Sequence, residues 1–255
     1  MGAGATRRTR EHALAQWVEP HLAGDDQATF TSTVTSGEHG RILRKWSSRD
    51  LNLVTKRVCG TCNNGWMSRL ETSVQPLLTT MLRGHRRTFH RGGQETLAGW
   101  AVKTALALGQ LHLDSYEQIT GTHYRCAATR AGGQPSESCQ VFLGAYRGRS
   151  VVNHQLRRLT LNAEQDDEAS AFLSTFIVGP ALFQVFFHDY PEPVTLERAS
   201  GTLEWVSQIW PYVEPASWPP KRLTDEESLY QLKEGLSPMV ERTYVELPSL
   251  SALRR

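Results

Sequence analysis

Residues 58–71, VCGTCNNGWMSRLE, form the most informative motif in the N-terminal part of this chain. Two cysteines lie three positions apart, followed by two asparagines, a glycine, a tryptophan and a helical pattern. Two thiolates at this spacing can bind one tetrahedral Zn²⁺ if the turn between them is tight, and Gly60 permits such a turn. A turn fixed in this way also fixes the direction of Asn63 and Asn64. We therefore expect a rigidly supported polar site directly after Cys62.

The composition is that of an ordinary globular protein, with 39% hydrophobic and 21% charged residues in 255. No apolar run reaches the ~18 residues of a membrane span. The N-terminal MGAGATRRTR lacks the apolar block of a secretory signal, so a cytoplasmic location follows by default. Four cysteines do not make a disulfide framework in a chain of this length, and Cys126 and Cys139 are interpreted as isolated thiols.

Charge is distributed unevenly along the chain. Residues 1–91 hold 14 Lys/Arg and 7 Asp/Glu, a net charge of +7, whereas residues 92–255 hold 14 and 19, a net charge of −5. A basic first part on an acidic remainder indicates a surface that faces a polyanion such as nucleic acid.

The periodicity predicts an α+β protein in two parts. An apolar helical stripe from Trp66 to Met81 predicts a helix, which Pro76 should kink or break. The basic segment 84–93 is interpreted as a linker, which divides the chain into 1–91 and 92–255. Residues 97–111 are apolar almost all round and predict a buried helix. Residues 29–49 are predicted to be a loop or a weak hairpin about residues 36–37, and a second hairpin is predicted about residues 179–180. Further predictions are strands at 140–146, 157–161 and 203–210, and a late helix at 224–232 capped by Thr224 with Glu227.

The motif segments together resemble a known family. Thr9-Arg10-Glu11-His12 followed by Trp17, and then Cys-x-x-Cys-Asn-Asn-Gly-Trp-Met-Ser-x-Leu-Glu, resembles the HNH nuclease superfamily, and most closely a bacterial group within it. The resemblance covers residues 9–17 and 58–82, about an eighth of the chain. It extends more weakly to the Trp100-Lys103-Thr104 helix and to the pieces Ile209-Trp210-Pro211 and Trp218-Pro219-Pro220. It implies an N-terminal ββα-metal, treble-clef-like module, followed by a mixed α+β domain with an antiparallel sheet and one buried helix.

The resemblance also implies residue roles. His12 is the general base, Glu11 and Asn63 hold a divalent metal ion, and Asn52 is the asparagine that orients the base. The same roles follow chemical logic, because phosphodiester hydrolysis needs a base near pH 7 and a cation that offsets phosphorane charge. Mg²⁺ prefers oxygen ligands, which a carboxylate and an amide supply. Because neighbouring residues of a strand face opposite sides, we expect a bulge or turn at the Glu11-His12 pair itself.

One departure from the family pattern concerns zinc. Members of the group usually carry a second Cys-x-x-Cys before the Glu-His pair, and the residues before Thr9 hold no cysteine. Cys59 and Cys62 alone leave a structural Zn²⁺ half-coordinated. Either no zinc binds, or ligands come from elsewhere, or Met1 lies inside a longer natural protein. We expect the last, and an upstream in-frame stop with no intervening cysteine codon would contradict it.

Three functions stay open at this point. The first is a metal-dependent endonuclease acting on nucleic acid, with DNA the expected substrate, whose backbone is positioned by Arg10, Arg44, Lys45, Lys56 and Arg57. The second is a catalytically weak or inactive nucleic-acid-binding or regulatory protein on the same scaffold. The third is a protein-interaction domain in which the cysteine turn is purely structural.

Overall fold

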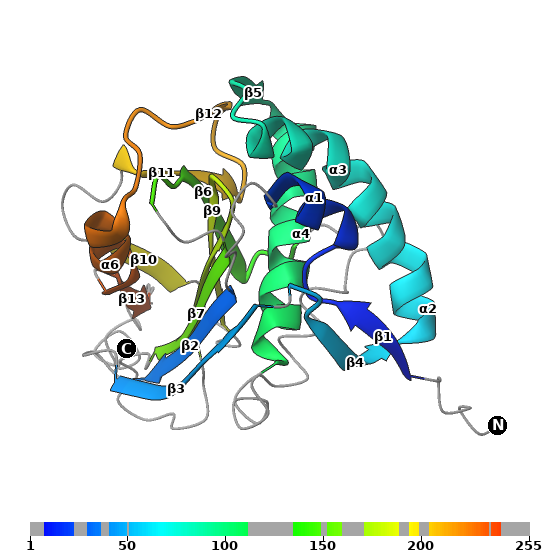
Figure 1. Ribbon diagram of the computed structural model, residues 1–255. Helices are drawn as coiled ribbons and strands as arrows, with labels where there is room; N and C mark the ends of the chain where they lie inside the picture. Colours follow the sequence, from blue (N-terminus) through cyan, green and yellow to red (C-terminus); the bar gives the residue numbers. More distant parts are fainter. Residues whose placement is uncertain are drawn as a thin grey trace, which may run out of the picture.

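One helix, α4 (Arg91–Gly109), lies between a large sheet on one side and helix α3 (Ser68–Leu82) on the other (Figure 1). Every residue of α4 from Leu97 onward is buried, as its apolar sequence predicts. Trp100 packs edge-on against two phenylalanines of the sheet, with ring centroids 6.0 Å from Phe176 and 5.4 Å from Phe183. The predicted buried helix is therefore present and forms the centre of the molecule.

The computed structural model describes residues 8–22, 30–36, 41–49, 51–111, 135–148, 152–159, 171–188, 194–198, 204–234 and 236–240. Within these ranges, no helix is both long and apolar enough to cross a membrane. The predicted isolated thiol Cys126 lies outside them, and Cys139 is buried.

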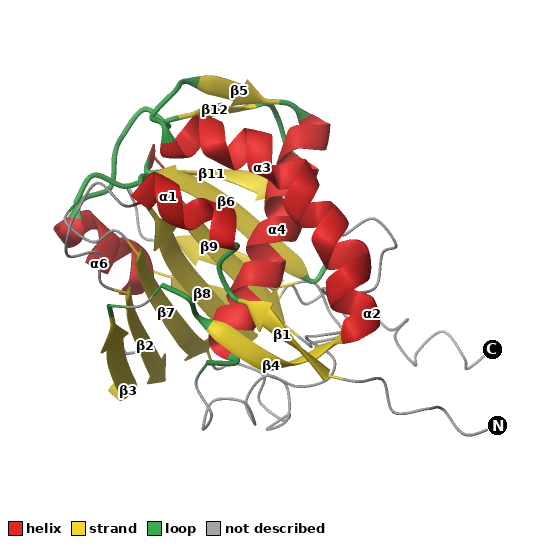
Figure 2. Cartoon of the chain, turned by 45° about the vertical axis from the view of Figure 1, so that its right-hand side comes forward, coloured by secondary structure: helices red, strands yellow, loops and turns green. Residues whose placement is uncertain are grey.

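The main sheet has seven strands in the order β11-β6-β9-β8-β7-β2-β3 (Figure 2). Its pairings are antiparallel except for one, between β2 and β7, which is parallel. The strands are β2 (Phe30–Ser36), β3 (Arg41–Ser48), β6 (Cys139–Ala145), β7 (Val152–Leu159), β8 (Ala171–Val178), β9 (Ala181–His188) and β11 (Val206–Trp210). The predicted hairpin about Gly179 is confirmed as β8–β9, and the weak hairpin about residues 36–37 as β2–β3. The α+β class is confirmed.

Smaller elements surround this sheet. Three two-stranded ladders pair β1 (Arg8–His12) with β4 (Val54–Cys59), β5 (Arg87–Phe89) with β12 (Ala216–Trp218), and β10 (Val194–Arg198) with β13 (Leu236–Val240). The short helices are a 3-10 turn at Gln16–Val18, α1 (Glu19–Leu22), α2 (Gly60–Cys62), a π-helical turn at Asn63–Met67, and α6 (Glu226–Glu234). In Figure 1, α6 lies on the side of the main sheet opposite to α4.

Helix α3 matches the predicted apolar stripe, with Leu70, Val74, Leu78 and Met81 buried against α4 and its neighbours. The predicted break at Pro76 is wrong, because the helix continues to Leu82. Pro76 lies on the exposed side of α3, where water can satisfy the carbonyl group that loses its N–H partner.

The N-terminal and C-terminal parts share a sheet and a core. The predicted boundary near residue 91 falls between β5 and α4, and the predicted linker 84–93 holds β5 and the first residues of α4. Strand β2 from one side pairs with β7 from the other, and one apolar cluster contains both Phe30 and Trp100. Separate roles for 1–91 and 92–255 stay a prediction.

Candidate functional site

The Glu-His pair lies on β1, which pairs antiparallel with the strand that ends at the first cysteine. Thr9 pairs with Val58, and Glu11 pairs with Thr55, so β4 has one more residue than β1 between these two pairs. This is a β-bulge, which bends the strand and changes side-chain direction. The irregularity lies between Thr9 and Glu11, and its extra residue is on the partner strand. Glu11 and His12 themselves pair in regular register with Thr55 and Val54, so the bulge or turn predicted at the Glu-His pair is not present.

The cysteine turn is tight, as the sequence predicts. Cys59 ends β4, and its sulfur accepts a hydrogen bond of 3.1 Å from the backbone N–H of Cys62. The side-chain hydrogen bond between the two thiols lowers the pKa of Cys59. The same hydrogen bond, together with burial, raises the pKa of Cys62. The turn therefore holds one sulfur atom that favours negative charge and one that favours its proton.

Asn63 connects this turn back to β1. Its amide nitrogen donates to the hydroxyl of Thr9 at 3.2 Å and to the backbone carbonyl of Arg10 at 3.0 Å. A backbone carbonyl only accepts, so the NH₂ group of Asn63 must face β1. The side-chain oxygen Oδ1 is then directed away from these two acceptors. The side chain of Asn63 is therefore held against β1 at Arg10, which is the residue before Glu11.

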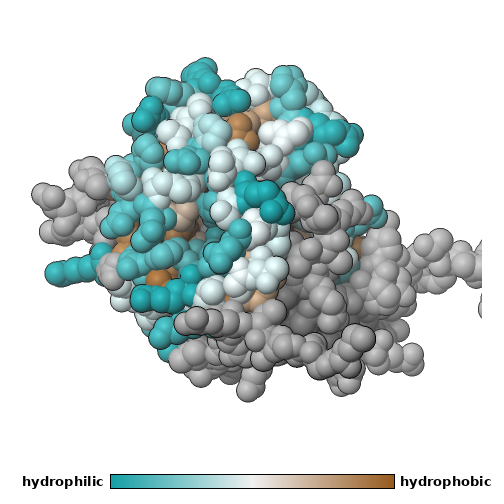
Figure 3. Space-filling model, turned by 90° about the vertical axis from the view of Figure 1, so that its right-hand side faces the viewer, coloured by the Kyte–Doolittle hydropathy of each residue, from teal (hydrophilic) through white to brown (hydrophobic). Residues whose placement is uncertain are grey.

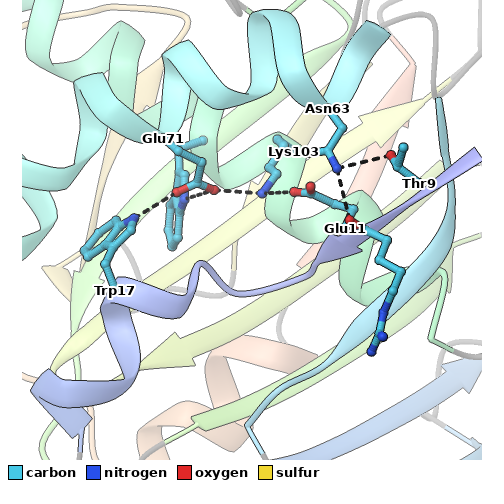
Figure 4. Close-up of polar contacts among 8 residues, drawn as sticks. Thr9, Glu11, Trp17, Asn63, Glu71 and Lys103 are labelled. Carbon is cyan, nitrogen blue, oxygen red and sulfur yellow. Dashed lines mark hydrogen bonds and ion pairs between the residues drawn. The ribbon is translucent and has the colours of Figure 1, made fainter. Parts of the chain in front are cut away.

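Glu11 takes part in a buried cluster with Lys103 and Glu71, which we call the Glu11–Lys103–Glu71 cluster (Figure 4). The Lys103 ammonium lies 2.6 Å from Glu11 Oε1 and 2.7 Å from Glu71 Oε1. Lys103 is 3% exposed and Glu11 is 7% exposed. Strand β1, helix α3 and helix α4 each supply one charged group, so the cluster joins all three elements.

The two carboxylates differ in their number of partners. Glu71 also accepts hydrogen bonds from the indole N–H groups of Trp17, at 3.3 Å, and Trp100, at 3.2 Å. Among the described residues, Lys103 is the one polar partner of the Glu11 side chain. Two carboxylates and one ammonium carry a formal charge of −1, and most of the hydrogen bonding is on Glu71.

Burial acts to lower the pKa of Lys103, but the negative charges of Glu71 and Glu11 outweigh it, so this pKa lies above the ordinary value of 10.5. Neither Lys103 nor Glu71 was among the predicted site residues. A signal was present, because Lys103 is the one charged residue between Thr96 and Leu111, and a lysine in an apolar helix needs a counter-ion.

His12 and Asn52 line one pocket of about 230 Å³, whose lining does not include Glu11, Glu71 or Lys103. Its lining combines a few polar groups with apolar side chains of the 3-10 turn and α1. The lining residues are His12, Leu14, Ala15, Gln16, Val18, Glu19, Leu22, Leu51 and Asn52. The predicted base and its predicted orienting asparagine therefore lie at one pocket, whereas Glu11 points to Lys103.

The oxygen donors near β1 suit a hard divalent cation. Lys103 lies 2.6 Å from one carboxylate oxygen of Glu11, and Asn63 donates to β1 through its amide nitrogen, so these hydrogen bonds do not use Oδ1. Mg²⁺ commonly needs one or two carboxylates, with waters and substrate phosphate as its other ligands. Lys103 would keep Glu71 as a counter-ion if a cation took a share of Glu11.

A structural zinc ion fits less well. Cys59 and Cys62 supply two sulfur ligands of the four that a structural site needs. In the described part of the chain, no group of three or more His, Cys, Asp or Glu side chains is arranged to hold a metal ion.

The predicted nucleic-acid contacts fall in two places. Arg10 on β1 and Lys56 on β4 are exposed beside the bulge, whereas Arg44 and Lys45 lie on β3, at the edge of the main sheet. The side chain of Arg57 lies outside the described residues. Figure 3 shows the side of the molecule that faces right in Figure 1, and its coloured surface is mostly hydrophilic or neutral.

Comparisons with family models, with curated proteins and with solved structures gave no match to this chain.

Proposed function

We propose that this chain is a metal-dependent endonuclease that hydrolyses phosphodiester bonds of nucleic acid, with DNA as the expected substrate. One observation carries the proposal, namely the hydrogen bonds from the Asn63 amide to Thr9 and Arg10. They bring the residue after the cysteine turn to the strand that holds Glu11 and His12. Two segments about fifty positions apart, each predicted to be part of one site, therefore lie together.

The order of the local elements supports the resemblance to the ββα-metal module. Strands β1 and β4 form an antiparallel pair, and the chain passes from β4 through the cysteine turn into α3. Between the two strands the chain also makes β2 and β3, which belong to the main sheet. The proposed module is therefore two strands and a helix with a hairpin inserted between the strands.

In the proposed mechanism, His12 accepts the proton of the attacking water. A neutral imidazole is a suitable base near pH 7, and Asn52, which lines the same pocket, would orient it. Glu11 and Asn63 would hold a divalent ion, which offsets negative charge on the phosphorane and on the leaving oxygen. The exposed Arg10 and Lys56, beside this site, would contact phosphates of the bound strand.

Nicking of supercoiled plasmid, with and without Mg²⁺ or Mn²⁺, tests the proposal. We expect metal-dependent nicking that falls by at least about 100-fold in His12→Ala, since general-base catalysis contributes on the order of 10²–10⁴. His90→Ala is the matched control, because His90 is an exposed histidine outside the proposed site, and it should nick at the wild-type rate. Wild-type nicking by His12→Ala would reject His12 as the base.

A second function has one specific observation in its favour. Because Lys103 already neutralises part of the Glu11 charge, the site attracts a divalent ion less strongly than an unpaired carboxylate would. The alternative is a nucleic-acid-binding or regulatory protein that has kept this scaffold with little or no turnover. Salt-dependent DNA binding without nicking in any metal would favour it. A protein that binds no nucleic acid at low salt would fit neither function.

A further inference from the structure

Three sequence segments each place one charged residue in the Glu11–Lys103–Glu71 cluster. Glu11 comes from the Glu-His pair, Glu71 ends the segment that begins with the cysteine turn, and Lys103 lies in the middle of α4. Lys103 cannot move far, since α4 is buried on all sides from Leu97 to Gly109. Its ammonium is a fixed positive charge 2.6 Å from a proposed metal ligand.

Glu71 determines how much of this positive charge reaches Glu11. It holds the ammonium at 2.7 Å, and the indoles of Trp17 and Trp100 fix its own two oxygens. With Glu71 charged and in place, the ammonium is shared, and Glu11 keeps part of its negative charge for another cation. Without Glu71, Glu11 would be the sole counter-ion of a buried lysine.

We propose that Lys103 and Glu71 are positioning residues that set, with opposite signs, the affinity of the Glu11 site for a divalent cation. Lys103 weakens cation binding by its charge and holds the Glu11 side chain in place. Glu71 strengthens cation binding because it draws the ammonium of Lys103 to itself. Neither residue is proposed to touch the ion. This inference rests on the proposed function, in which Glu11 and Asn63 hold the metal.

Titration calorimetry with Mn²⁺ alone on the full chain, without nucleic acid, tests the proposal. Lys103→Met removes one positive charge, and we expect Mn²⁺ to bind roughly tenfold or more tightly than to the wild type. Glu71→Gln leaves Glu11 as the only carboxylate on Lys103, and we expect binding roughly tenfold or more weakly. Glu11→Gln should abolish binding. A purely structural cluster would lower the stability of both variants without moving their Mn²⁺ affinities in opposite directions.

Matched controls remove the same charges far from the site. Lys221→Met and Glu227→Gln change exposed residues, and both should keep the wild-type Mn²⁺ affinity. Circular dichroism confirms that each variant is folded. If Lys103→Met does not fold, Glu71→Gln carries the test, because its amide keeps the shape of the carboxylate and Lys103 keeps Glu11 as partner.

The outcomes separate this inference from the proposed function. Wild-type binding that Glu11→Gln abolishes, with unchanged affinity in Lys103→Met and Glu71→Gln, overturns the inference and leaves the metal site standing. Binding detected in Lys103→Met but not in the wild type supports the inference. Mn²⁺ binding to neither the wild type nor Lys103→Met overturns both.

Discussion

At the scale of single residues, Lys103 is the group whose environment is most unusual. It is almost fully buried and bridges carboxylates from β1 and α3. Removing one member of a buried ion pair costs more than the pair contributes, because the remaining charges lose their partner in a poorly solvated place. Lys103 therefore matters for stability whether or not the chain is an enzyme.

We expect Lys103→Met to lower the free energy of unfolding by about 3–5 kcal/mol at pH 7, because it leaves Glu11 and Glu71 without their shared cation. Since the pKa of Lys103 is higher in the folded state than 10.5, its stabilising effect is complete below that pH. The effect is lost as pH rises through the folded-state pKa. The difference in unfolding free energy between wild type and variant, from urea titrations at pH 7 to 11.5, should therefore be constant and then shrink above pH 10.5.

Glu11→Gln is the control for this prediction. The variant keeps Glu71 as a counter-ion for Lys103, so it should lose less stability than Lys103→Met. A larger loss in Glu11→Gln than in Lys103→Met, or a difference that grows at alkaline pH, would contradict this account of the cluster.

At the scale of elements, two glycines with positive φ lie at the ends of elements that support the site, namely helix α3 and strand β8. Gly84, with φ of 73°, follows α3, where its N–H bonds to the Met81 carbonyl and that of His85 to the Thr80 carbonyl. This is the Schellman arrangement. Gly179, with φ of 56°, makes the β8–β9 turn.

Replacing each of these glycines with alanine should show how much backbone strain and steric contact lower the free energy of unfolding. A Cβ at Gly84 meets open space, so Gly84→Ala should cost about 1–2 kcal/mol from the left-handed backbone alone. A Cβ at Gly179 would lie 3.1 Å from Leu22 and from Leu82, so Gly179→Ala should cost about 2–5 kcal/mol. Thermal or urea unfolding measures both.

Gly92→Ala is the control for the glycine pair. Gly92 lies in the first turn of α4 without positive φ, and its Cβ would meet open space. The variant should stabilise the protein by up to about 1 kcal/mol through helix propensity. Equal decreases in the free energy of unfolding for Gly84→Ala and Gly179→Ala would show that Leu22 and Leu82 can move away from the added Cβ without an energetic penalty.

The start of α6 shows what local sequence can and cannot predict. A capping pair with a spacing of three was predicted at Thr224 and Glu227, and the pair present is Asp225 and Ser228. Thr224 is unavailable as a cap because its backbone bonds to Ala145 and Arg147, beside the main sheet. Residue spacing predicted the helix and the kind of cap. The position of the cap was set by the backbone hydrogen bonds of Thr224 to Ala145 and Arg147, which are distant in sequence.

We expect Asp225→Asn to weaken α6 in a pH-dependent way. Hydrogen bonds from Ser228 lower the pKa of Asp225 below its ordinary value of 3.8. The stabilising effect is therefore present above pH 3.8 and is lost as pH falls through the folded-state pKa. Unfolding midpoints of wild type and variant should differ at pH 6, and the difference should shrink as pH falls below 3.8. A difference that stays the same across this pH range would mean that charge on Asp225 contributes nothing.

At the scale of the whole molecule, the element types followed from sequence and their arrangement did not. Apolar periodicity predicted α3, α4 and most strands of the main sheet. It could not predict that β2 pairs in parallel with β7, because β2 is a short, Thr- and Ser-rich run with no sign of its partner. In the candidate site, the resemblance to the HNH superfamily led to the hypothesis that Asn63 and Glu11 belong to one site. The ion pairs of Lys103 depend on the packing of α4 and were missed.

Neither half of the chain should fold alone. Residues 92–255 without β2 leave one edge of β7 unpaired and the α3-facing side of α4 exposed. We expect fragments 1–91 and 92–255 to lack a cooperative unfolding transition by circular dichroism and calorimetry, in contrast to the full chain. A cooperative transition in either fragment would show that the shared core is dispensable for that half.

The parallel pairing of β2 with β7 also has a consequence for how the protein is made. Ser32 and His154, which hydrogen-bond across these strands, are 122 positions apart in the chain. At the usual speed of translation, roughly ten seconds separate their emergence from the ribosome. Throughout that interval the β2–β3 hairpin lacks its partner strand β7, so the backbone N–H and C=O groups on that edge of β2 are unpaired. The apolar side chain of Ile42 is also exposed on this hairpin. Yield of the native protein should therefore depend on what shields a nascent chain from its neighbours on a crowded polysome.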